Sequence, residues 1–172
     1  MAILPILIAP DPRLKRRALP VEAVGREEQQ LMDDLLETMR AAHGIGLAAP
    51  QVGILKRIIV ADVAQPGEAP QPWRLANPEV VWKSDEVVAS EEGCLSLPEQ
   101  YADVARPARV RVRFLDHQNE MREIEADGLL AKCLQHEIDH LEGMLFVDHL
   151  TQLKRDIILR KLAKYKKLAA PV

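Results

Sequence analysis

Residues 135–140, which read QHEIDH, constrain this chain more than any other part of its sequence. Their two histidines, His136 and His140, are four positions apart, so on an α-helix they lie on one face, one turn apart. Both imidazoles can then bind the same metal ion. Glu137 is rotated away from that face and can reach a water molecule at the ion without being a ligand itself. Two ligands, one base and one ion are typical of a metal-activated hydrolase.

The sequence around this motif predicts a buried helix over residues 127–141. Two neighbouring stripes recur there at helical spacing, formed by Leu130, Leu134, Ile138 and Leu141 and by Leu129, Cys133, His136 and His140. A helix that is apolar over more than half of its girth is buried, with Asp127 placed as its N-cap and Gly143 just past its end. The two histidines could instead be ordinary core residues, but a buried Glu137 without a partner would be costly. The pattern therefore favours a metal site.

A third ligand has to come from outside this helix. Three downstream residues are possible third ligands: Glu142, Asp148 and His149. Glu142 is too close to His140 in the sequence for its side chain to reach back to the same ion. His149 is nine residues after His140 and is a conceivable ligand. Cys94 is the better candidate, because a bound cation lowers the pKa of a thiol and stabilises its thiolate. Gly93, directly before it, lets the backbone approach the ion.

Three segments together resemble the peptide deformylases of the bacterial type. Residues 44–51, GIGLAAPQ, are similar to that family's GxGLAAxQ; residues 92–96 are similar to its EGCLS, and residues 135–140 to its QHExDH. A single HExxH occurs by accident moderately often, whereas all three motifs in this order within 172 residues do not. Residues 3–7 and 11–14 also resemble the family's start, so the resemblance covers essentially the whole chain.

The resemblance implies removal of the N-formyl group from the methionine that begins a new polypeptide, with release of formate. It implies a divalent metal ion, typically iron(II) in the cell with zinc, nickel or cobalt as substitutes, and the ligands Cys94, His136 and His140. A Cys-His-His set by itself suits both iron(II) and zinc. Glu137 is then expected to take a proton from the metal-bound water and return it to the leaving amine. Gln51 and the backbone N–H of Leu95 are expected to stabilise the oxyanion.

The resemblance also implies that the glycine segment, residues 44–51, lets an extended substrate peptide lie against the backbone. The substrate-binding residues expected from it are Gly44, Ile45 and Gly46, with Gly93 of the second motif. It is no phosphate-binding P-loop, because no Lys-Ser/Thr pair follows its glycines. Ile45, Leu129 and Cys133 are candidates for the pocket that takes the first side chain. For Leu129 and Cys133, ordinary core packing is an equally good interpretation.

One position departs from the family pattern, because Tyr101 stands where close relatives usually carry Arg. Arg106, a little further on, is the residue expected to compensate in part. Two other functions share the HExxH motif. A zincin-like metallopeptidase would need a downstream third ligand and a long cleft, and a purely structural metal site would need four protein ligands.

The pattern of the remaining sequence predicts an α+β fold for one catalytic domain spanning residues 1–172. Antiparallel strands are expected to wrap around the central metal-binding helix. The expected elements are a helix over 26–42, a glycine-rich loop over 44–51, a buried strand over 57–63, one or two strands within 74–88, a hairpin of 109–115 with 121–126, and a C-terminal helix from residue 150.

The C-terminal segment differs in charge from the rest of the chain. Residues 151–172 carry a formal charge of +6, whereas the other residues sum to −9, for a net charge of −3. A solvated closing helix is the simplest interpretation of residues 150–172, but a basic helix also suits the phosphate-rich ribosome from which the substrate emerges. The net charge argues against sequence-specific nucleic-acid binding. With two cysteines and no signal-peptide or membrane-span pattern, we expect a cytoplasmic protein without a membrane partner.

Overall fold

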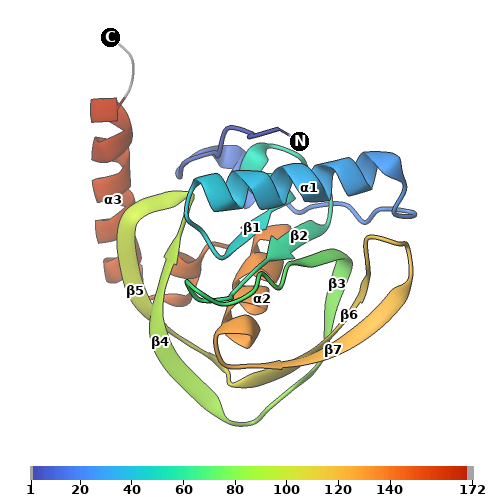
Figure 1. The fold of residues 1–172 in the computed structure, drawn as a ribbon. Coiled ribbons are helices and arrows are strands. Elements are labelled where there is room, and N and C mark those ends of the chain that lie inside the picture. Colours follow the sequence, from blue (N-terminus) through green and yellow to red (C-terminus); the bar gives the residue numbers. More distant parts are fainter. Residues whose placement is uncertain (1, 170–172) are drawn as a thin grey trace.

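A computed structural model describes residues 2–169 and places one helix, α2 (Gly128–Leu141), at the centre of an α+β fold. Figure 1 shows α2 enclosed between a five-stranded sheet and a long two-stranded hairpin. The other helices are α1 (Arg26–Ala41) and α3 (Gln152–Ala169), with the short 3-10 helices η1 (Pro12–Lys15), η2 (Ala49–Val52) and η3 (Phe146–His149).

All strand pairs named here are antiparallel, as the sequence predicts. The larger sheet has the order β1-β2-β3-β6-β7, and β4 pairs with β5 in the hairpin. The strands are β1 (Gly46–Ala48), β2 (Ile58–Ala61), β3 (Trp73–Lys83), β4 (Val87–Cys94), β5 (Leu97–Pro107), β6 (Arg109–Leu115) and β7 (Met121–Asp127).

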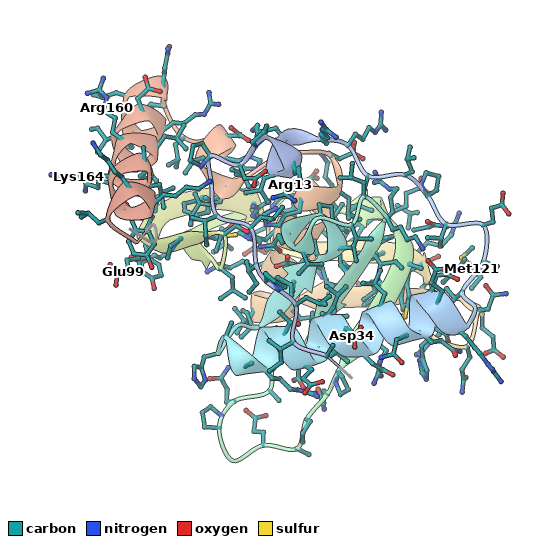
Figure 2. All side chains as sticks on the ribbon, turned by 90° about the horizontal axis from the view of Figure 1, so that it is seen from above. Arg13, Asp34, Glu99, Met121, Arg160 and Lys164 are labelled. Atoms are coloured by element: carbon teal, nitrogen blue, oxygen red, sulfur yellow. The ribbon has the colours of Figure 1, made fainter. Side chains whose placement is uncertain are left out.

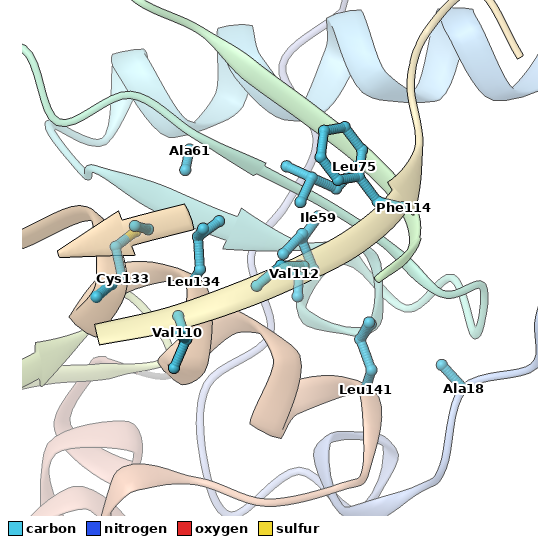
Figure 3. Close-up of a cluster of buried hydrophobic side chains, with 13 residues drawn as sticks. Ala18, Ile59, Ala61, Leu75, Val110, Val112, Phe114, Cys133, Leu134 and Leu141 are labelled. Atoms are coloured by element: carbon cyan, nitrogen blue, oxygen red, sulfur yellow. The ribbon is translucent and has the colours of Figure 1, made fainter. Parts of the chain in front are cut away.

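Helices cover both faces of the sheet near its β2 strand, which explains why that strand is apolar at every position. Ile59 packs with α2, whereas Ile58 and Val60 pack with α1. Figure 3 shows the cluster on the α2 side, where Leu134 of α2 lies close to Val112 of β6. Each fully buried side chain of this size contributes roughly 1.5–3 kcal/mol, so this packing fixes α2, and the histidines it carries, against the sheet.

The β6–β7 hairpin confirms the prediction made from alternation. Val110, Val112 and Phe114 are buried, the residues between them are more exposed, and Arg109 pairs with Asp127 at the open end of the hairpin. The last strand therefore leads directly into α2. The C-terminal end of α2 is also as expected, because Gly143, two residues past the helix, has φ 74°, the left-handed conformation that favours glycine.

Three details of the predicted elements were wrong. The segment 44–51 is not only a loop, because it contains β1 and the first three residues of η2. A long strand, β5, follows Cys94 where no strand was expected. Asp127 occupies the N-cap position of α2, but its side chain makes no capping hydrogen bond.

The C-terminal helix forms as predicted and stands at one edge of the molecule beside β5 (Figure 1). Its buried residues, Ile158 and Leu162, pack against Phe146 and Val147 of η3. The basic helix was predicted to extend to residue 172, and residues 170–172 lie outside the described residues. None of the helices over residues 2–169 combines the length and the apolar character that a membrane span requires.

Candidate metal and active site

Three side chains from two elements converge at a buried point between α2 and the end of β4. The donor atoms of Cys94, His136 and His140 all lie within 4.8 Å of one another. Helical spacing brings the two imidazoles together, with ring centroids 5.1 Å apart. Cys94 reaches them from β4, with its Sγ 3.4 Å from Nε2 of His140. Two imidazoles and a thiol are donors that suit iron(II) and zinc.

The surroundings of these donors fit a divalent cation. Burial holds the pKa of His140 well below its ordinary value, so this imidazole keeps a lone pair free for a ligand bond. Burial has the same tendency at His136, but the Glu137 carboxylate and hydrogen bonds to Cys94 and Glu92 raise its pKa well above the ordinary value. The negative groups that favour a proton on His136 also favour a metal cation at the same imidazole. The cation and the proton therefore compete for the ring nitrogen.

Glu137 lies next to the three donors without being one of the group. Its side chain is almost fully buried, at 4% exposure, and burial raises its pKa to about 7. Its Oε1 atom has no hydrogen-bond partner among the residues that the structure describes. A carboxyl group with a pKa near neutrality is suited to taking up a proton and returning it.

Gln51, in η2, is buried at 1% exposure and has a fixed orientation. Its Oε1 accepts a hydrogen bond from the backbone N–H of Ala48 at 2.9 Å. Its Nε2 therefore points the other way, donating to Ser96 Oγ at 3.0 Å with Cys94 Sγ 3.5 Å away. This arrangement presents an amide donor, rather than an acceptor, to the group formed by Cys94, His136 and His140.

A cavity of ≈ 430 Å³ opens above the site. The residues assigned to substrate binding from the sequence all line it, namely Gly44, Ile45, Gly46, Gly93, Leu129 and Cys133. So do Gln51, Cys94, Leu95, His136 and Glu137. Cys133 also belongs to the core cluster between α2 and the sheet, and burial raises the pKa of its thiol well above its usual value. Cys133 therefore keeps its proton and serves as an apolar wall.

Six further residues, which the motifs did not indicate, also line the cavity. These are His43, Glu91, Pro98, Glu99, Tyr101 and Lys132. Tyr101 is 63% exposed, and its ring lies so close to Gly93 that a Cβ there would be 2.6 Å from it. Arg106 does not take over the role of the missing arginine, and this expectation was wrong. Its guanidinium is buried and bonded to Glu92 and Asp139, and Arg106 itself is not among the residues that line the cavity.

Sequence reasoning also missed a carboxylate that orients His136. Oε1 of Glu92 lies 3.0 Å from Nδ1 of His136, which leaves Nε2 of the ring for a metal. Burial would raise the pKa of Glu92, but hydrogen bonds from His136 and Arg106 lower it to about 2, so the group is a carboxylate. Its place directly before Gly93 in the second motif was the available signal.

The downstream residues considered as a third ligand have other partners. Glu142 bonds to Arg57, Asp148 bonds to Lys15, and His149 bonds to Asp139. None of the three belongs to the converging donor group found among residues 2–169. The geometry therefore favours the upstream Cys94, and with it disfavours a zincin-like arrangement.

A buried glutamate beside converging cysteine and histidine donors, at the base of a cavity, is the arrangement of a metal-dependent hydrolase. Comparison with known proteins narrows this class. A family model described as "Polypeptide deformylase" matches residues 3–156, and the chain belongs to that family. It is a hydrolase that removes the formyl group from the N-terminal formyl-methionine of new polypeptides.

Individual relatives are similar along their whole length. The peptide deformylase of Phenylobacterium zucineum is 55% identical over 169 residues, covering 98% of this chain and 100% of that protein. The crystal structure of the Ehrlichia chaffeensis peptide deformylase superposes with a TM-score of 0.93 at 40% identity, covering 97% of this chain and 98% of that one. A crystal structure of the Ehrlichia chaffeensis peptide deformylase in complex with actinonin superposes with a TM-score of 0.92 at 42% identity, covering 99% of this chain and 100% of that one.

Proposed function

We propose that one divalent metal ion is held by Cys94, His136 and His140, and that Glu137 moves the proton during deformylation. The observation that carries this proposal is the convergence of the three donor atoms within 4.8 Å at the base of the cavity that Glu137 also lines. When bound there, the ion supplies Lewis acidity, which polarises a carbonyl and lowers the pKa of water towards neutrality.

Glu137 takes a proton at its buried carboxylate from the water that attacks the formyl carbon. The carbon–nitrogen bond then breaks, and the same carboxyl gives its proton to the leaving nitrogen, so that formate and a free amine result. A pKa raised to about 7 by burial makes both transfers accessible near neutral pH. Its Oε1 atom has no hydrogen-bond partner among the described residues, so no other donor competes for that oxygen.

Gln51 and Leu95 stabilise the negative charge that develops on the formyl oxygen. The support for Gln51 is its fixed orientation, with Nε2 turned towards Cys94. The backbone N–H of Leu95, the residue after Cys94, is the second donor. The formyl group itself is small, so a narrow site can separate it from bulkier acyl groups by size.

The cavity walls hold the peptide part of the substrate. Gly44, Gly46 and Gly93 line the cavity, where residues without side chains let an extended peptide backbone approach closely. Ile45, Leu129 and Cys133 form the pocket for the methionine side chain. Ile45 and Leu129 are partly exposed in the cavity, which favours this role over plain core packing.

Assay of a short formyl-methionyl peptide tests the overall activity. We expect stoichiometric formate and a free N-terminal amine, with every internal peptide bond intact. Cleavage within the peptide would instead support the zincin-like alternative.

For the metal itself, we propose iron(II) in the cell, with zinc, nickel or cobalt as substitutes. The Cys-His-His donor set suits both iron(II) and zinc, and the thiolate beside iron implies sensitivity to oxygen. Metal analysis of protein purified without oxygen is expected to give one iron per chain.

Gly46→Ala is expected to reduce deformylation strongly. A Cβ at this position would lie 2.6 Å from Oε2 of Glu137 and 2.7 Å from Sγ of Cys133, so the carboxylate must move. A displacement near 1 Å at a reacting group can cost about 10²-fold in rate. Initial rates of formate release measure the effect. Gly25→Ala is the matched control, because its Cβ meets only Glu28 at 3.5 Å; equal rates for the two variants would contradict the assigned role of Glu137.

We also propose that the basic C-terminal helix docks the enzyme on the ribosome, and hence that the enzyme works in the cytoplasm. Figure 2 shows Arg160 and Lys164 on the side of α3 that faces away from the rest of the molecule. Lys161 is exposed as well, whereas Ile158 and Leu162 are buried against η3. The outward face is thus free to contact phosphates, and such contacts weaken steeply with salt.

Removing residues 164–172 is expected to reduce salt-sensitive binding to ribosomes while leaving turnover of a short formyl peptide intact. Co-sedimentation at two salt concentrations measures binding. The triple variant Arg160→Gln, Lys161→Gln and Lys164→Gln, which keeps the helix, should behave like the truncation. Charge removal at Arg111 and Arg113 of β6 is the control. If the truncated and full-length chains co-sediment equally, the helix only closes the fold.

A further inference from the structure

A chain of hydrogen bonds leads from His136 to a histidine at the surface. His136 Nδ1 lies 3.0 Å from Glu92 Oε1, and Arg106 donates to both oxygens of Glu92 at 2.6 and 2.9 Å. Nη1 of Arg106 donates to Asp139 Oδ2 at 2.9 Å, and Nε2 of His149 lies 2.8 Å from that same oxygen. Because a carboxylate only accepts, Nε2 of His149 carries the proton in this bond.

The inner links of this chain are buried and fully charged. Arg106 is 7% exposed, and it makes two hydrogen bonds to the carboxylate of Glu92, which is 3% exposed and also contacts His136. A buried guanidinium depends on its partners, because an unpaired charge in such a place is costly. Arg106 therefore keeps its own position, and with it that of Glu92, only while Asp139 also remains bonded to it.

Asp139 is more exposed than Arg106 and Glu92, the other two links between His149 and His136. Its side chain is 20% exposed, so water competes with Arg106 for its oxygens, and His149 is its second described partner. His149 ends η3, whose Phe146 stacks on the ring of His136 with centroids 6.3 Å apart. The short helix η3 thus contacts α2 twice, once at the imidazole proposed to bind metal and once at Asp139.

We propose that His149 is a positioning residue for the metal site. By donating a hydrogen bond to Asp139, His149 keeps that carboxylate bonded to Arg106. Arg106 in turn stays bonded to Glu92, and Glu92 stays bonded to Nδ1 of His136. The lone pair on Nε2 of His136 then remains directed at the ion. The role of His149 is thus to slow metal loss rather than to bind metal or substrate. This inference rests on the proposed metal ligands.

The test measures metal release from cobalt-loaded enzyme. Cobalt(II) bound to the thiolate of Cys94 gives a charge-transfer band, and its decay after addition of excess EDTA gives the dissociation rate without any activity assay. His149→Leu removes the donor at similar volume. His149→Gln restores an N–H donor, and His117→Leu, on the turn between β6 and β7, is a matched surface control.

His149→Leu is expected to release cobalt up to about tenfold faster, because partners in direct contact with a ligand typically change metal affinity by 10–100-fold and His149 acts further out. His149→Gln should restore slow release, and His117→Leu should match wild type. In an Asp139→Asn background, His149→Leu should add little, because the two act through one path.

Release from His149→Leu at the wild-type rate would overturn the proposal, even if its unfolding temperature were lower, because the residue would then only support the fold. Equal release from the Leu and Gln variants, or additive effects with Asp139→Asn, would overturn it as well. A wild-type protein without the thiolate band would overturn the proposed metal site itself.

Discussion

Glu137→Ala is expected to lose most deformylation while it keeps one metal ion per chain and a folded core. The side chain lies beside the Cys94, His136 and His140 donors without joining them, so its removal leaves the ligands in place. What is lost is the proton transfer, and general acid–base catalysis typically contributes about 10²–10⁴-fold in rate. Formate release and metal content, measured on the same sample, test both parts of the expectation.

Glu99→Ala provides the comparison, because Glu99 is a carboxylate on the rim of the same cavity with no proposed chemical role. It should retain nearly wild-type turnover. A Glu137→Ala protein that purified without metal would show that Glu137 is a ligand. Near-normal activity would show that the proton moves by another route.

Cys94→Ser is expected to weaken metal binding and to remove most activity. A serine hydroxyl does not ionise near neutral pH, so the replacement loses the negative ligand. Loss of a direct ligand should exceed the roughly 10–100-fold effect on affinity of losing one of its outer partners. The thiolate-to-cobalt charge-transfer band should disappear in this variant, and equilibrium dialysis measures the fall in affinity.

Cys133→Ser is the matched substitution at the other cysteine and should be mild. Cys133 is buried, burial raises the pKa of its thiol well above the usual value, and its Sγ lies 3.5 Å from the carbonyl oxygen of Ile45. A serine hydroxyl can make the same hydrogen bond. If the cobalt band survived in Cys94→Ser and vanished in Cys133→Ser, the ligand assignment would be reversed.

Local patterns predicted the parts of the fold that carry strong periodicity. The helix α2 follows from apolar residues at helical spacing around His136 and His140, and the β6–β7 hairpin follows from strict alternation in β6 with a turn and a returning strand after it. The strand β5 was missed because its exposed and buried residues alternate with few strongly apolar side chains. The strand β1 was missed because it has only three residues and begins with Gly46, two positions after Gly44, so the segment looks like a loop.

The candidate site divides in the same way. The proposed ligands and Glu137 sit in short motifs and could be named from the sequence. The path from Glu92 through Arg106 and Asp139 to His149 could not, because it joins four elements that only the tertiary fold brings together. Arg106 is the clearest example of a role that only the tertiary fold reveals. Its position in the chain suggested substrate binding, whereas in the structure it is buried and bonded to Glu92 and Asp139. The extent of the catalytic domain, residues 1–172, stays a prediction.

Titration of the metal-free protein with cobalt(II) tests the central claim most directly, namely that one ion held by Cys94, His136 and His140 is required for deformylation. The thiolate charge-transfer band and the rate of formate release are followed in the same samples. We predict that both rise together and saturate at one equivalent per chain. Full formate release before any cobalt is added, or a band that saturates without a gain in activity, would contradict this account.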